Sequence, residues 1–124
     1  MVLDLAHVYS YSRLKRQDPM AVLKTFPLET VVELHVAGGQ LDPEHTWRYA
    51  DTHLHPILPE QFDLLAAAVA SCSNVGAVTY EISPGLPFST FERDFEQLEQ
   101  VLTRAAFSPR VQREHWPKGA RGAA

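Results

Sequence analysis

The sequence predicts an α/β fold in which short parallel strands alternate with helices. Three runs dominated by valine, leucine and alanine, at residues 2–8, 31–37 and 76–82, have the composition of parallel strands that are covered on both faces. Helix-forming segments separate these runs, so right-handed crossovers would bring the strands side by side in one sheet. With 124 residues, 45% of them hydrophobic, the chain is long enough to bury the core of one domain.

Two helices are predicted between these strands. Asp18 is suited to the N-cap and Pro19 to the first turn of a short helix that ends before Pro27. Pro59 opens a second helix, which continues through strong helix formers to about residue 71. Cys72, the only cysteine in the sequence, follows this helix and is expected to be a small buried hydrophobe. A single cysteine also excludes an intrachain disulfide.

A third helix is predicted over residues 88–105 by a strongly amphipathic pattern. Ser89 and Glu92 have the spacing of a capping box at its start. Its apolar side chains recur on one face, opposite a polar face that includes Asp94. We expect the apolar face to lie in the core and not to form a binding groove. It consists of Phe88, Phe91, Phe95, Leu98, Val101, Leu102 and Ala105.

Charge and hydropathy exclude several classes of partner. Residues 1–107 carry fourteen of the fifteen acidic residues but seven of the eleven basic ones. The segment 108–124 is basic and rich in glycine, proline and alanine, so a flexible tail is expected beside a domain at 1–107. The acidic domain argues against nucleic-acid binding. No apolar run reaches the roughly 18 residues of a membrane span and no secretion signal is visible, so we expect no membrane partner and a cytoplasmic location.

Six side chains with metal-binding groups stand at or near the ends of apolar runs. They are Asp4, His7, His35, Asp51, His53 and Glu81. In a parallel α/β sheet the carboxyl ends of the strands converge on one crevice, so residues far apart in sequence can share a site there. Carboxylates and neutral imidazoles together suit iron and manganese. The residues alone leave alternatives open, because Asp4 and His7 have the spacing of a local cap.

The segment around residues 51–57 carries further expectations. If it is extended, Asp51 and His53 point to the same side, because alternate side chains share a face. His55 is close enough in sequence to be a partner of these ligands. His45 and His115 are expected to be solvated histidines in a loop and in the tail.

Several of these segments together resemble the DUF692 (UPF0276) family in order and spacing. The segments are D-L-A-H-V-Y at 4–9, D-P at 18–19, F-P-L at 26–28, V-V-E-L-H-V-A-G-G at 31–39, D-T-H-L-H-P-I at 51–57, and Y-E at 80–81 with Pro84 in the loop that follows. The H-V-A-G and D-T-H pieces are the most specific of them. The resemblance covers about residues 2–105.

This resemblance implies a barrel of the triosephosphate-isomerase type, of which the chain would form the C-terminal half. The family includes multinuclear non-haem iron enzymes that oxidise cysteine residues of ribosomal peptides. Carried over position by position, the six side chains named above fall on the iron-binding positions, with two or three ions in the complete barrel and Mn or Zn as alternatives. A small partner protein that presents the peptide substrate is also implied.

A complete barrel of this kind has about twice as many residues as this chain. We therefore expect the N-terminal half-barrel, or a second copy of the chain, to pair with the open sheet edges. Two other functions remain open on the sequence alone. One is a non-catalytic half-barrel that acts as an interaction module, and the other is a mononuclear metal-dependent isomerase or hydrolase.

Overall fold

The computed structural model describes residues 1–109 of the chain. Its strands are β1 (Val2–Asp4), β2 (Glu33–Ala37), β3 (Gln40–Leu41), β4 (Tyr49–Ala50) and β5 (Ala77–Glu81). Its helices are α1 (Leu5–Lys15), α2 (Pro19–Leu23), α3 (Pro59–Ser71) and α4 (Phe88–Arg104), with a 3₁₀ turn η1 (Leu28–Thr30). Most of the tail predicted at 108–124, including His115, lies outside the described residues.

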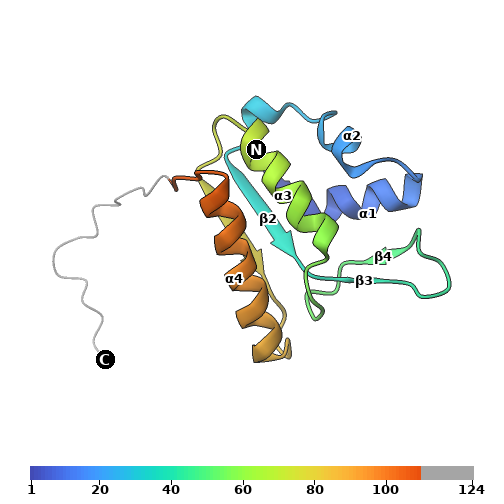
Figure 1. Ribbon diagram of the computed structural model, residues 1–124. Helices are drawn as coiled ribbons and strands as arrows, with labels where there is room; N and C mark the ends of the chain where they lie inside the picture. The colour runs from blue at the N-terminus through green and yellow to red at the C-terminus, as the bar shows by residue number, and fades with distance from the viewer. Residues whose placement is uncertain (110–124) are drawn as a thin grey trace, which may run out of the picture.

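The main sheet confirms the predicted α/β class. Its strand order is β1-β2-β5, and both pairs of neighbouring strands are parallel. The register places Asp4 opposite His35 and His35 opposite Thr79, so one row crosses all three strands. Parallel strands joined by helices are consistent with part of a TIM-type barrel. Strands β3 and β4 form a separate antiparallel hairpin beside α1 (Figure 1).

Only one face of the main sheet is covered by the described helices. Leu34 and Val36 of β2 are buried in the core, whereas Glu33 and His35 between them are only partly buried. The expectation that both faces are covered is therefore wrong for residues 1–109. The strand alternates between apolar and polar positions because successive side chains point to opposite faces. In a barrel the apolar positions would face the helices and the polar ones the interior.

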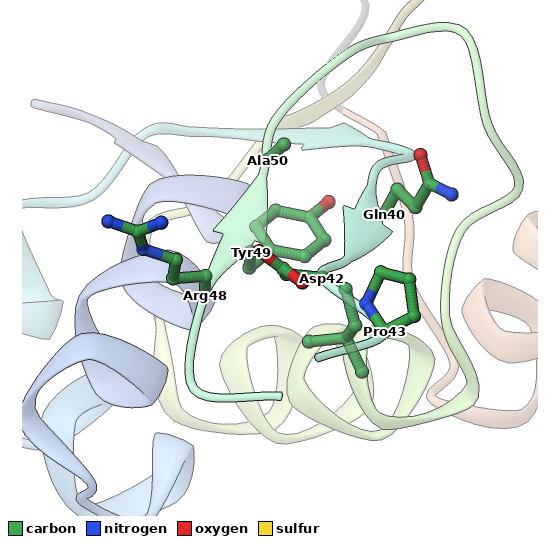
Figure 2. Close-up of a pocket in the computed structure, with 7 residues that line it drawn as sticks. Gln40, Asp42, Pro43, Arg48, Tyr49 and Ala50 are labelled. Carbon is green, nitrogen blue, oxygen red and sulfur yellow. The ribbon is translucent and has the colours of Figure 1, made fainter. Parts of the chain in front are cut away.

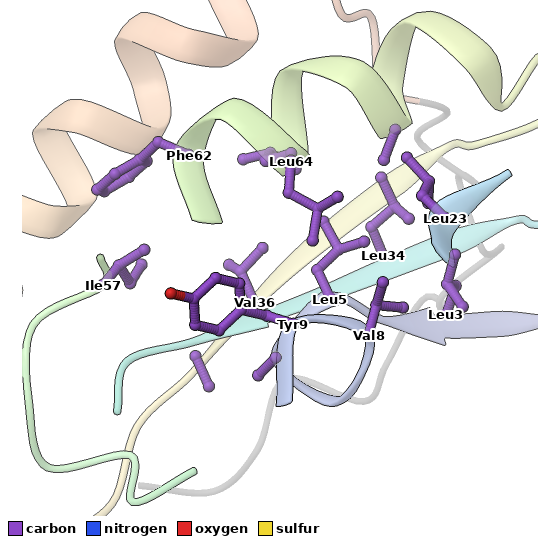
Figure 3. Close-up of a cluster of buried hydrophobic side chains, with 14 of the residues drawn as sticks. Leu3, Leu5, Val8, Tyr9, Leu23, Leu34, Val36, Ile57, Phe62 and Leu64 are labelled. Carbon is purple, nitrogen blue, oxygen red and sulfur yellow. The ribbon is translucent and has the colours of Figure 1, made fainter. Parts of the chain in front are cut away.

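The core lies between this face and the helices (Figure 3). Leu3 and Leu34 from the sheet join Leu5 of α1 and Leu64 of α3 in one cluster of buried side chains. Cys72 ends α3 and is buried, as predicted. No helix within residues 1–109 is long and apolar enough to cross a membrane.

The first strand is shorter than predicted, because the run at residues 2–8 changes from strand to helix at Leu5. Asp4 is extended and its Oδ1 accepts a hydrogen bond of 3.1 Å from the backbone N–H of His7, which starts α1. The buried side chains of α1 then follow helical spacing at Leu5, Ala6, Val8, Tyr9 and Ser12. Most residues of the run at 2–8 are apolar, and buried strands and buried helices both use such residues, which is why the run also resembles a strand. Strands β2 and β5 and helices α2 and α3 lie where the sequence predicts them.

Helix α4 differs from its prediction at its start. It begins at Phe88 with Pro87 as the N-cap, and no side chain caps it. The capping box predicted from Ser89 and Glu92 is therefore wrong. Both residues lie inside the helix, so neither is in the N-cap position that a capping box requires.

The predicted apolar face of α4 is confirmed only in part, because Leu98, Val101 and Leu102 lie in or against the core but other members of the stripe do not. The buried residues of α4 are Asp94 and Leu98, whereas Phe88 and Phe95 are 70% and 45% exposed. Asp94 Oδ2 accepts hydrogen bonds from the Ile57 N–H at 2.9 Å and from the Tyr80 hydroxyl at 3.1 Å. These bonds satisfy the buried carboxylate, so the helix can turn a polar residue toward the sheet. The prediction that the whole apolar stripe lies in the core is wrong.

Candidate metal centre

The partly open face of the sheet brings three of the predicted ligands together. Asp4 and Glu81 are the last residues of β1 and β5, and His35 lies between them on β2. Asp4 has two separate roles, because its Oδ1 caps α1 while its Oδ2 lies 3.6 Å from His7 Nε2. The start of α1 thus places His7, 71% exposed, beside the strand ends.

Asp51 and His53 reach the same place from the loop after β4. Gly38 permits this approach, because a Cβ at that position would lie 1.8 Å from the His55 carbonyl oxygen. The His53 N–H donates to the Gly38 carbonyl at 3.0 Å, and the His53 carbonyl accepts from the Ser83 N–H at 3.0 Å. His53 has a φ of 57°, so the segment is not extended as expected. This left-handed residue turns the imidazole back toward Asp51.

A chain of short contacts joins all six predicted side chains in one cluster. His7 Nε2 lies 3.2 Å from Asp51 Oδ2, and His53 Nε2 lies 3.1 Å from Asp51 Oδ1. Glu81 connects the other side, with its Oε1 3.2 Å from His35 Nδ1 and its Oε2 4.0 Å from His53 Nε2. Sequence positions as distant as 4 and 81 therefore share one site.

Within the cluster, two groups of three residues have the geometry to hold an ion. One group is Asp4, His7 and Asp51, and the other is Asp4, His35 and Glu81. In each group, one ligand atom from every residue lies within 4.8 Å of the others. Asp4 belongs to both groups, and a carboxylate has two oxygens with which to bridge neighbouring ions.

The distances between the imidazole nitrogens and the carboxylate oxygens fit pairs of atoms that bind the same ion. Ligands with bonds of about 2.1 Å to one ion lie about 3.0 Å apart at right angles and about 3.4 Å apart in a tetrahedral site. The contacts of 3.1–3.2 Å between imidazole nitrogens and carboxylate oxygens fall in this range. Asp51 Oδ1 is buried without a hydrogen-bond partner among the described residues, although His53 Nε2 is close to it. An ion at this oxygen would satisfy it, so the donor set fits a cation.

Pairs of histidine and carboxylate also occur without a site. His45 Nδ1 lies 3.7 Å from Asp42 Oδ2 on the exposed hairpin, which agrees with the prediction of a solvated loop histidine. His55, expected near Asp51 and His53, instead has its Nδ1 2.7 Å from Thr52 Oγ1. The convergence of three histidines and three carboxylates distinguishes the cluster from these isolated pairs.

The sequence prediction missed Glu33, which contacts the cluster, and Thr79, which holds Glu33. Glu33 Oε1 lies 3.0 Å from His35 Nε2 and accepts a hydrogen bond of 2.6 Å from Thr79 Oγ1. The bond from Thr79, followed by the contact with His35, lowers the pKa of the Glu33 carboxyl below its ordinary value. The signal was present in the sequence, because Glu33 is two residues before His35 and so points to the same face of β2.

A hollow of about 440 Å³ lies on the hairpin formed by β3 and β4 (Figure 2). Arg48, Tyr49 and Ala50 line it on the strand that leads into Asp51. The Tyr49 hydroxyl accepts a hydrogen bond of 3.0 Å from Gln61 Nε2, which also donates to the Ala37 carbonyl at 3.2 Å. These bonds join the hairpin and α3 to the end of β2 and so fix the position of the hollow relative to the sheet.

The fold and the cluster define an α/β protein with a candidate centre for one or more metal ions. The model of the RiPP precursor modification enzyme family MbnB/TglH/ChrH matches residues 1–103, and the chain belongs to this family. It is also 28% identical over 106 residues to a UPF0276 protein of Streptomyces avermitilis. The resemblance to the DUF692 (UPF0276) family is thus confirmed. The alignment covers 85% of this chain and 21% of that relative, so the chain spans about a fifth of the relative's length.

Proposed function

We propose that the chain supplies part of a multinuclear iron site in an enzyme that oxidises cysteine residues of a ribosomally made precursor peptide. The observation that carries the proposal is the convergence of three histidines and three carboxylates, with Asp4 common to two groups of possible ligands. Mixed imidazole and carboxylate donors suit iron, and also manganese or zinc. The family description, a RiPP precursor modification enzyme, supports a peptide as the substrate class.

In this proposal the six side chains hold and orient the ions. Asp51 directs its two oxygens toward His7 and His53, and Asp4 belongs to both groups of possible ligands, so each would be suited to link neighbouring ions. Iron, when bound, supplies the redox capacity for an oxidation of the thiol by O₂. The exposed His7 leaves one side of the cluster open to a substrate. The hollow on the hairpin, lined in part by Tyr49 and Ala50 just before Asp51 in the sequence, would offer room for residues that flank the reacting cysteine.

The proposed partner is the remainder of a barrel, either from a longer chain or from a second copy. Large apolar side chains are exposed on the helices that follow β1 and β5, the two edge strands of the main sheet. Tyr11 and Leu14 on α1 are 51% and 58% exposed. On the β5 side, Phe91 stacks on Tyr80 with ring centroids 5.9 Å apart, next to the exposed Phe88 and Phe95. Neighbouring strands and helices of a barrel would cover these surfaces and add further ligands.

Metal binding by variants of the full 124-residue chain tests the proposal. Fe(II) is titrated under anaerobic conditions, and the bound metal is measured after desalting. We expect up to two ions per chain, because two groups share Asp4. His7→Ala should remove one ion and Glu81→Ala the other, whereas Asp4→Ala should weaken both. His45→Ala is the matched control, since it removes a histidine that pairs with a carboxylate outside the cluster.

The outcomes separate the iron oxidase from the other functions. Two irons with the expected pattern of losses support the multinuclear site. A single Zn or Mn that depends on Asp4, His35 and Glu81 favours a mononuclear isomerase or hydrolase. No metal above the level of an unrelated protein, or equal losses in the His45→Ala control, rejects the site and favours an interaction module.

A further inference from the structure

His35 lies between two carboxylates, and its two contacts differ in geometry. The contact between Nε2 and Glu33 Oε1, at 3.0 Å, is aligned as a hydrogen bond. Nδ1 lies 3.2 Å from Glu81 Oε1, but these two atoms are not aligned as a hydrogen bond. A neutral imidazole carries one proton, so one nitrogen donates while the other keeps its lone pair.

The contact with Glu81 has the geometry of two ligands beside one ion. An ion bound to Nδ1 lies along the axis of the nitrogen lone pair, and a second ligand at about 90° lies off that axis, about 3.0 Å from the nitrogen. A hydrogen bond from Nδ1 to Glu81 would instead need the oxygen close to the axis. The off-axis contact therefore favours a lone pair on Nδ1 and a proton on Nε2.

The surroundings of Glu33 hold it in place to receive that proton. Thr79 is paired with His35 across β2 and β5, and its hydroxyl donates to Glu33 Oε1 at 2.6 Å. Glu33 and His35 lie two residues apart on one strand, and the sheet fixes both backbones. Strand geometry and one hydroxyl thus set the position of the carboxylate that faces Nε2.

We propose that Glu33, held by Thr79, is a positioning residue that keeps the proton of neutral His35 on Nε2 and leaves the Nδ1 lone pair, next to Glu81, free to bind an ion. A histidine that binds a metal commonly donates its other ring N–H to a carboxylate, which fixes the tautomer and the ring orientation. The role of Glu33 in positioning a metal ligand depends on the proposed metal site. The tautomer of His35 does not, because it can be measured in the chain without metal.

The tautomer is measured in the metal-free, ¹⁵N-labelled 124-residue chain, at a pH where the ring of His35 is neutral. Long-range ¹H–¹⁵N spectra distinguish the protonated ring nitrogen from the one with a lone pair. We expect Nε2 to be protonated in the wild-type chain. Glu33→Ala should produce a mixture with more Nδ1–H, and Thr79→Val should produce a smaller change in the same direction. Glu29→Ala, an exposed glutamate outside the sheet, is the control and should leave the His35 spectrum unchanged.

A second readout measures metal affinity. Co(II) binding, followed by its visible absorption, should weaken about 10- to 100-fold in Glu33→Ala, the range seen when partners of metal-binding histidines are removed. Protonation on Nδ1 in the wild type, or an unchanged tautomer in a folded Glu33→Ala chain, overturns the inference. If Glu33→Ala does not fold, an unchanged tautomer in Thr79→Val overturns it. A tautomer that depends on Glu33 in a chain without iron affinity supports the inference and rejects the proposed function.

Discussion

Alanine substitutions at Leu98 and Phe95 test the orientation of α4 in one experiment. Leu98 is 4% exposed in the core, whereas Phe95, three residues earlier on the same helix, is 45% exposed. Leu98→Ala should lower the free energy of unfolding by about 2–5 kcal/mol, from lost burial and the cavity left behind. If Phe95 were in the core as the amphipathic pattern predicts, its truncation would cost about 3–5 kcal/mol.

The structure predicts a smaller loss for Phe95→Ala. Burying a whole phenylalanine side chain contributes about 1.5–3 kcal/mol, so burying about half of it contributes about 1–1.5 kcal/mol. Stacking on Phe91, with ring centroids 5.6 Å apart, adds part of the roughly 0.5–1.5 kcal/mol typical of aromatic pairs. The better helix propensity of alanine returns about 0.5 kcal/mol. We therefore expect Phe95→Ala to cost about 1–2 kcal/mol, less than Leu98→Ala.

Urea unfolding followed by far-UV circular dichroism measures both losses. With a slope of about 1.5 kcal/mol per molar urea, a loss of 3 kcal/mol lowers the midpoint by about 2 M. The titrations are repeated over a range of protein concentrations, because a second copy packed on α4 would make the midpoint depend on concentration. An equal or larger loss for Phe95→Ala at all concentrations would refute the orientation. A larger loss that appears only at high concentration would identify Phe95 as part of an interface.

Two further predictions concern the tyrosines and a glycine. Burial raises the pKa of Tyr9, Tyr49 and Tyr80 above that of an unfolded tyrosine, so their contribution to stability is complete below roughly pH 10 and is lost as the pH rises through the folded values. Urea midpoints measured from pH 8 upward should fall above roughly pH 10, and an unchanged midpoint would contradict the burial of these hydroxyls. Gly38→Ala should cost about 1–3 kcal/mol or more and weaken Fe(II) binding as well, because the new methyl group would overlap the His55 carbonyl. Unchanged Fe(II) binding in this variant would show that the loop after β4 does not need this close approach.

Local signals were sufficient to predict much of the fold. Asp18 and Pro19 mark the start of α2, and Pro59 marks the start of α3, because caps and proline act within one helical turn. Helix α1 was not predicted, because Asp4 is both the end of a strand and the N-cap of a helix. The residues after Asp4 are apolar at spacings that fit a buried strand and a helix equally well, so periodicity alone does not separate the two.

The orientation of α4 depends on distant partners. The amphipathic pattern predicts a helix correctly, but it assigns Asp94 to the solvent side. Asp94 is buried because Ile57 and Tyr80, 37 and 14 residues away, supply its hydrogen bonds. The six side chains of the cluster were picked out by residue type and position. The spacing of Glu33 and His35 places both on one face of β2, but the hydrogen bond from Thr79 that holds Glu33 depends on another strand. Contacts between strands are set by register, which the sequence of one strand does not contain.

Along strand β2, residues that pack in the core alternate with residues that belong to or contact the cluster. Leu34 and Val36 point into the core, and Glu33 and His35 point to the partly open face, because the side chains of a strand alternate. Changes at the polar positions can therefore alter the cluster while the packing of the helices is kept. Asp4 does not follow this division. One of its oxygens caps α1 and the other faces His7, so loss of its carboxylate removes a helix cap and a shared ligand together. The helix that carries His7 and the cluster that would use it thus depend on the same side chain.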